Sequence, residues 1–182
     1  TKLHHETRGS PSAPESYSIF ADMIKGLISQ KRDCSIIAFN YDLGLDYSLY
    51  HHRILPNYGL DDIDVTNTEC VTFLKLHGSL DWGRGTKCRK INPSREFGLT
   101  ETKPGSGYST IPVISKLKKQ KCKYCGEPSE EDPFIVPPTW NKTAYHEQIG
   151  AVWQRAALEL KDAENIFVLG YSLPSSDLFF HY

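Results

Sequence analysis

The chain has 182 residues, of which 39% are hydrophobic and 24% are charged, a composition that suits one packed globular domain and argues against a disordered chain. Its 21 basic and 22 acidic side chains nearly balance, so the net charge of −1 gives no overall field that would draw the protein to nucleic acid or to an anionic membrane. Any basic patch must therefore be local.

The first part of the sequence predicts a loop, a helix and a strand in that order. Residues 1–16 are polar and broken by two prolines, so we expect a linker or loop. Apolar residues recur at helical spacing over 17–31, which predicts an amphipathic helix. The run 34–42 begins as a nearly continuous apolar stretch and ends in polar residues, as expected for a strand that is covered on both faces.

Helices and strands continue to alternate further along the chain. We expect a helix over 43–53 and a second buried strand over 71–76. A third strand is predicted at 134–136, a helix over about 143–162, and a last strand at 165–169. This alternation predicts an α/β fold with a three-layer, Rossmann-like parallel sheet and crossover helices.

The stretch between the second and third predicted strands differs in composition. Its first part is rich in Gly, Lys, Arg, Ser and Thr without sustained periodicity, which indicates a loop. A segment with five lysines, 116–123, follows it. We therefore expect an insertion over about 83–132, either a loop or a small zinc-ribbon-like subdomain, within one domain that spans 17–182 and is incomplete at both ends.

Polar residues follow three of the predicted strands directly. They are Asn40 with Asp42, His77 with Ser79, and Gly170 with Ser172. Because the carboxyl ends of parallel strands share one edge of a sheet, where open α/β sheets bind ligands, we expect these groups to converge. Each residue alone is a weak signal, since a single histidine after a strand is more often structural.

Four short motifs occur in the order found in SIR2-like domains. They are FNYD at 39–42, KLHGSL at 75–80, Pro137-Pro138 with Lys142, and LGYSLP at 169–174 with Asp177. The order of the four is specific although no single motif is, and the match runs from about 35 to 177 with a gap in the insertion. The chain resembles a bacterial SIR2-like, sirtuin-related, NAD-consuming domain of the antiphage-defence type.

The resemblance implies roles for the residues at the strand ends. His77 is implied to be the general base that takes a proton from a ribose hydroxyl of NAD, and Asn40 to orient the attacking water or the ribose. Asp42, Gly170 and Ser172 match cofactor-binding positions. These residue types fit the chemistry, because nicotinamide leaves as a neutral molecule through an oxocarbenium-like transition state that needs a base and fixed dipoles but no acid.

Among the reactions that the resemblance allows, we favour hydrolysis of NAD to nicotinamide and ADP-ribose, which would deplete NAD during phage infection. Related deacylases bind an acyl-lysine peptide as an added strand, and the tandem prolines at 137 and 138 remove two N–H donors from the matching region. Two alternatives stay open, a non-catalytic sensor of NAD or ADP-ribose and an NAD-dependent protein deacylase. A nucleic-acid module built on the lysine-rich segment is less favoured.

Two elements of the family are missing from the sequence, the glycine-rich loop that wraps the NAD pyrophosphate and the final strand. No G-x-G-x-x-G motif is present. Either the chain is the middle of a longer protein, which we favour, or NAD binding has been lost. We expect the 182 residues alone to bind NAD poorly and to act with other domains or as a homo-oligomer.

The cysteines indicate a possible structural zinc site and a reducing compartment. Cys122 and Cys125 have the C-x-x-C spacing of half a zinc knuckle, and Cys88 is a third candidate ligand with the fourth unidentified. A reduced pair in a loop is the alternative. The odd number of five cysteines, together with the lack of an apolar run of about 20 residues, predicts a cytoplasmic protein without a membrane partner.

Overall fold

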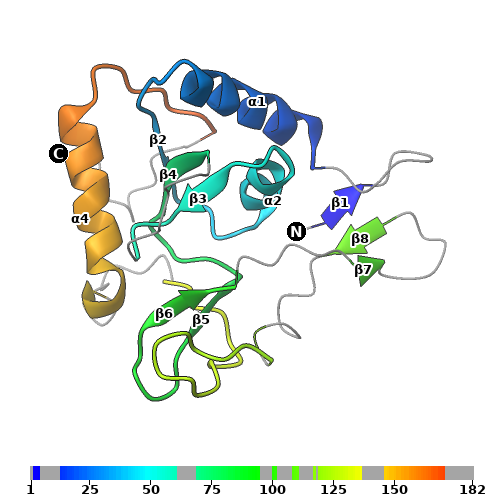
Figure 1. Ribbon diagram of the computed structural model, residues 1–182, viewed down its shortest axis with the longest axis vertical. Coiled ribbons are helices and arrows are strands. Elements are labelled where there is room, and N and C mark those ends of the chain that lie inside the picture. The colour runs from blue at the N-terminus through cyan, green and yellow to red at the C-terminus, as the bar shows by residue number, and fades with distance from the viewer. Residues whose placement is uncertain are drawn as a thin grey trace.

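The computed structural model describes residues 2–4, 13–60, 69–94, 100–101, 108–110, 117, 119–136 and 146–170, and Figure 1 shows how its helices and strands are arranged. The helices are α1 (Glu15–Ser29), α2 (Gly44–His51) and α4 (His146–Asp162). The strands are β1 (Lys2–His4), β2 (Ser35–Ala38), β3 (Leu55–Asn57), β4 (Cys70–Lys75), β5 (Trp82–Arg84), β6 (Ile91–Pro93), β7 (Thr100–Glu101) and β8 (Tyr108–Thr110). Within the described ranges, no helix is both long and apolar enough to cross a membrane.

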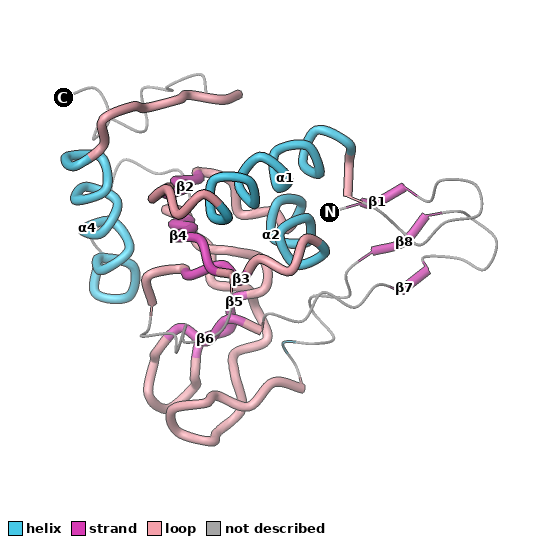
Figure 2. The backbone as a smooth tube through the Cα atoms, turned by 45° about the horizontal axis from the view of Figure 1, so that its top comes forward, coloured by secondary structure: helices cyan, strands magenta, loops and turns pink. Residues whose placement is uncertain are grey.

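A parallel sheet of three strands, in the order β2-β4-β3, forms the centre of the molecule. The central strand β4 pairs with β2 from Ser35 opposite Thr72 to Ala38 opposite Lys75. In Figure 2, α4 lies on one side of this sheet, and α1 and α2 lie on the other. The structure is therefore a mixed α/β fold with a parallel sheet between helices, as the alternation of predicted elements indicates.

Apolar side chains fill both interfaces of the central sheet. Fully buried residues of β4 include Phe73 and Leu74, which pack in one core with Ile24 of α1 and Val152 of α4. The helix α4 is also tied to the sheet by hydrogen bonds, since the indole Nε1 of Trp153 donates to the Leu76 carbonyl at 3.0 Å. Burial on both faces explains why β4 reads as a continuous apolar run rather than an alternating one.

The described part of the segment after β4 contains paired strands and is not a loop alone. Strands β5 and β6 pair as an antiparallel hairpin, with Trp82 opposite Pro93. An isolated bridge from Gly85 to Ser129 attaches the later part of the insertion to this hairpin, and a second bridge, Lys121 to Pro128, lies within that later part. The hairpin and the described residues 119–132 thus form a small antiparallel subdomain, and the hairpin lies below the main sheet in Figure 1.

The N-terminal segment, which was expected to be a linker or loop, contains β1. This strand pairs in antiparallel fashion with β8, and β8 also pairs with β7, so the three form a separate small sheet. Strands of two or three residues in a polar sequence leave no periodicity to detect, which is why the sequence did not predict them.

Two predicted strands are wrong. Residues 165–169 form no strand, and the side chains from Ile166 to Leu169 are between 61% and 84% exposed. A strand needs a neighbour for its backbone hydrogen bonds, and none of the described segments pairs with this one. Residues 134–136 make only an isolated bridge, between Ile135 and Gly78.

A tight approach at Gly78 generates a stability prediction. Gly78 has a φ of +76°, and a Cβ there would come within 2.2 Å of the Phe134 carbonyl oxygen. We expect Gly78→Ala to lower the free energy of unfolding by at least about 2 kcal/mol, through a strained backbone and a clash with main chain. Gly26→Ala, in α1 with open space around it, should instead stabilise by about 0.5–1 kcal/mol. Chemical denaturation of both variants measures this, and equal midpoints would contradict it.

Candidate functional site

The structure brings Asn40 and His77 to the same edge of the sheet. The parallel pairing of β2 with β4 ends with Ala38 opposite Lys75, and Asn40 and His77 each follow two residues later. The two segments are still hydrogen-bonded one residue after β4 ends, because the Leu76 N–H donates to the Ala38 carbonyl at 2.9 Å. Two segments that are far apart in the sequence therefore run side by side through the candidate catalytic positions.

The two candidate catalytic residues differ in exposure. His77 is 6% exposed and lies edge-on to Phe39, with ring centroids 5.7 Å apart. Its carbonyl accepts a hydrogen bond from the Val136 N–H at 2.9 Å, which fixes the backbone at this point. Asn40 is exposed. The site thus combines a shielded imidazole with a carboxamide that faces solvent.

Asp42 has structural contacts that the sequence did not predict. Its Oδ1 accepts a hydrogen bond from the Gly44 N–H at 2.8 Å, an Asx-type turn at the first residue of α2. A Cβ at Gly44 would lie 2.9 Å from a ring carbon of Tyr17, so a side chain there would push against α1. Asp42 therefore shapes the path from the end of β2 into α2, in addition to the cofactor contact that its position in the FNYD motif implies.

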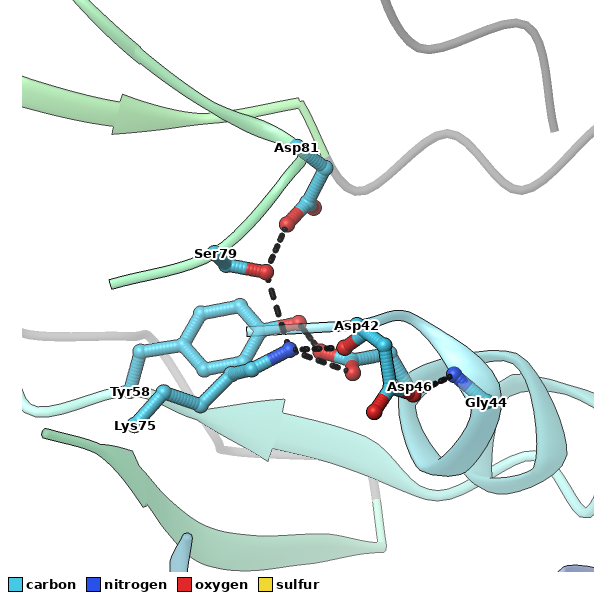
Figure 3. Close-up of polar contacts among 7 residues, drawn as sticks. All are labelled: Asp42, Gly44, Asp46, Tyr58, Lys75, Ser79 and Asp81. Atoms are coloured by element: carbon cyan, nitrogen blue, oxygen red, sulfur yellow. Dashed lines mark hydrogen bonds and ion pairs between the residues drawn. The ribbon is translucent and has the colours of Figure 1, made fainter. Parts of the chain in front are cut away.

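A buried lysine joins the two segments that carry Asn40 and His77. Figure 3 shows Lys75, the last residue of β4, pointing toward α2 with its ammonium among oxygen acceptors. Its Nζ lies 2.6 Å from the carbonyl oxygen of Asp42 and 2.7 Å from the carboxylate Oδ2 of Asp46. The third acceptor is the hydroxyl of Ser79, at 2.9 Å. All three protons of the ammonium are thereby used.

The acceptors of this ammonium are themselves held in place. Tyr58, which is fully buried, donates its hydroxyl proton to the other carboxylate oxygen of Asp46 at 2.7 Å. The Ser79 hydroxyl, while accepting from Lys75, donates to Asp81 at 2.7 Å. Lys75 is 1% exposed and Asp46 is 0% exposed, so water does not compete for these contacts. The result is a closed polar network inside the apolar core.

Sequence reasoning missed this network. In the sequence, Lys75 is named only within the KLHGSL motif and Ser79 only as a polar residue after a predicted strand, and Asp46 is not singled out. A signal was present, because a lysine that ends a buried apolar strand must find a buried acceptor or leave the core. The partner could not be identified without the fold, since Asp46 lies 29 residues earlier on a helix.

Of the third polar group, the structure describes Gly170 alone and does not bring it to the sheet edge. Gly170 lies in an exposed segment, with a φ of +63° and nothing within 4 Å of a Cβ built there. It was expected to follow a strand at 165–169, and the absence of that strand leaves it outside the sheet. Ser172, Pro137, Pro138 and Lys142 lie outside the described residues.

The three predicted metal ligands form a cluster in the small subdomain. The sulfur atoms of Cys88, Cys122 and Cys125 all lie within 4.8 Å of one another, and those of Cys88 and Cys122 are 3.5 Å apart. Three thiol sulfurs at this spacing can hold one metal ion, because tetrahedral thiolate sites have metal–sulfur distances of about 2.3 Å. Among the described residues, the group contains three ligands and no fourth.

The surroundings of the cluster fit metal binding. The pKa of the Cys125 thiol is lowered, mainly because the backbone N–H of Glu127 donates a hydrogen bond to its sulfur. At Cys88 the Lys90 N–H also lowers the pKa, but burial and the neighbouring sulfurs outweigh it and the pKa is raised. The thiolate is the form that binds metal, so the lowered pKa of Cys125 favours coordination by its sulfur.

Removing the buried ammonium should destabilise the fold strongly. We expect Lys75→Met to lower the free energy of unfolding by about 3–5 kcal/mol, because it leaves the Asp46 carboxylate buried without its cation. Lys25→Met is the matched control. Lys25 is half-exposed and forms an ion pair with Glu69 at 4.0 Å, so its loss should change stability by under about 0.5 kcal/mol. Denaturant unfolding of both variants measures the difference, and similar losses would show that the Lys75 contacts contribute no more than a surface pair.

No protein-family model matches the chain, and no curated protein matches it at a significant level. The resemblance to SIR2-like domains therefore stays a prediction based on the four motifs, and the function proposed for the chain rests on the geometry at the ends of β2 and β4.

Proposed function

We propose that the protein is an NAD glycohydrolase in which His77 is the general base and Asn40 the residue that orients water or the ribose. The observation that supports this most directly is the parallel register of β2 and β4, which continues into two segments that carry both residues to one sheet edge. In open parallel sheets this edge is where ligands bind. The motif order suggests the substrate class, and the common sheet edge of the two residues supports their acting together.

The reaction needs what these two side chains supply. Water adds to C1′ of the nicotinamide ribose, the bond from C1′ to the ring nitrogen breaks with its electron pair going to nicotinamide, and one proton is released. His77 takes a proton from a ribose hydroxyl, and that hydroxyl recovers a proton from the added water, so the released proton ends on the imidazole. The carboxamide of Asn40, on the exposed side, directs its oxygen toward the water or the electron-poor sugar. Shielding of His77 from bulk water strengthens the electrostatic part of this catalysis.

The second candidate function is a sensor that binds NAD or ADP-ribose without turnover. The low exposure of His77 favours it, because the ring can act as a base only if the ribose reaches it, and a ligand that binds without reaching the ring is not cleaved. A deacylase has no such observation in its favour. The role suggested by the resemblance, depletion of NAD in antiphage defence, applies to the hydrolase.

We propose in addition that the three-cysteine cluster holds a structural zinc ion. Zinc is the metal that closed thiolate sites select, and it would supply a cross-link between the start and the end of the insertion. Gly85 permits the cluster to form, because a Cβ there would come within 2.7 Å of the Cys122 sulfur and 2.8 Å of the Cys88 sulfur.

Release of nicotinamide from NAD by the full-length protein tests the proposed reaction. We expect His77→Ala and Asn40→Ala each to lower kcat by about 100-fold or more while the protein stays folded. His51→Ala, which removes an exposed histidine of α2, is the control and should keep parental activity. Binding of NAD with no turnover would support the sensor, and full activity in His77→Ala would exclude histidine catalysis.

Metal analysis of freshly purified protein tests the zinc proposal. We expect about one zinc ion per chain, lost in Cys122→Ser and reduced in Gly85→Ala. Cys70→Ser is the matched control, because Cys70 lies on β4 and is not one of the three clustered cysteines. Parental protein without zinc, or equal zinc content in Cys122→Ser, would contradict the proposal.

A further inference from the structure

We propose that Lys75 is a positioning residue, whose buried ammonium holds the segments of Asn40 and His77 in the register that the reaction needs. The inference rests on the proposed function, since it assigns a role in the same site. Lys75 touches no substrate in this proposal and acts only through the main chain and the hydroxyl that it binds.

The contacts of the ammonium connect the two catalytic segments directly. Asp42, whose carbonyl accepts one proton of Lys75, lies two residues after Asn40. Ser79, whose hydroxyl accepts another, lies two residues after His77. Lys75 itself is the residue of β4 that pairs with Ala38 at the end of β2. One ammonium group therefore contacts both segments close to where they leave the sheet.

A second link lies on the far side of the catalytic positions. The Leu80 N–H donates to the Tyr41 carbonyl at 2.9 Å, so the segments 40–42 and 77–80 are joined both there and at the sheet. Without the ammonium, the carbonyl of Asp42 and the hydroxyl of Ser79 lose the partner that they share. We expect the segments to shift relative to each other, and a displacement of about 1 Å of a catalytic group can cost about 100-fold in rate.

Stability alone does not account for a charge network at this place. Buried ion pairs are often replaced by apolar side chains of similar volume without loss of stability. An apolar side chain at position 75 can fill the same space, but it cannot bind the Asp42 carbonyl or the Ser79 hydroxyl. An ammonium differs from such a side chain because its hydrogen bonds are directional. Its acceptors are themselves held, Asp46 by Tyr58 and Ser79 by its bond to Asp81, so these bonds set the positions of the segments.

The decisive variant replaces the ion pair and its buried hydroxyl partner together, as Lys75→Met with Asp46→Leu and Tyr58→Phe. This leaves neither an unpaired carboxylate nor an unpaired phenol, so we expect the unfolding midpoint to return close to the parental value. For nicotinamide release we expect kcat to fall by about 100-fold and KM to change by less than about 3-fold. Hydrogen exchange at the Leu80 amide should become at least about 10-fold faster, because the bond to Tyr41 is less well held.

Two further variants keep the proposal falsifiable. Ser79→Ala removes one acceptor while the ion pair with Asp46 remains, and we expect a fall in kcat of about 10-fold in a folded protein. Lys25→Met should keep parental kcat and parental exchange at Leu80. A folded triple variant, or a folded Ser79→Ala variant if the triple does not fold, with parental kcat and parental exchange would overturn the proposal.

Failure of the proposed function is recognised separately. If the parental protein releases no nicotinamide from NAD, the glycohydrolase assignment fails. Leu80 exchange in the folded variants then decides the positioning role alone. Faster exchange at unchanged global stability supports a role of Lys75 in holding the two segments, and unchanged exchange excludes it.

Discussion

The structure depends most on the buried ammonium of Lys75 at the point where β2 and β4 end. Its three acceptors belong to the segment after β2, to α2 and to the turn after β4. These are the parts that must be fixed if Asn40 and His77 are to act together. An apolar core can bring helices and strands together, but a directional contact is needed to set the position of loops at a sheet edge to within a fraction of an ångström.

The small subdomain follows directly on the turn after β4. The turn after β4 leads through Gly78 to Trp82, which is fully buried, and the Phe134 N–H donates to the Trp82 carbonyl at 2.7 Å. The cysteine cluster lies further out and joins residue 88 to residues 122 and 125. A metal ion there would brace the insertion. The backbone that follows the insertion contacts the candidate site, since the Val136 N–H donates to the His77 carbonyl.

The sequence predicted the elements whose burial leaves a pattern, namely α1, α4, β2 and β4, and the C-x-x-C spacing indicated the cysteine cluster. It failed where structure depends on a partner. The apolar run 165–169 has the composition of a strand, but a strand forms only beside another strand. The short strand β3 was missed because Pro56 lies in its middle, although an edge strand can accept a proline. The role of Lys75 at the centre of the network also could not be predicted, because its acceptors are brought to it only by tertiary contacts.

We propose that the ends of β2 and β4 form one binding site for the ribose of a dinucleotide. The most direct measurement is a titration of the full-length protein with ADP-ribose, followed by NMR of its histidine rings, of which the chain contains seven. We predict a saturable shift of the His77 ring signals that Asn40→Ala weakens. Unchanged His77 signals at ligand concentrations that saturate binding elsewhere would contradict a shared site at this edge.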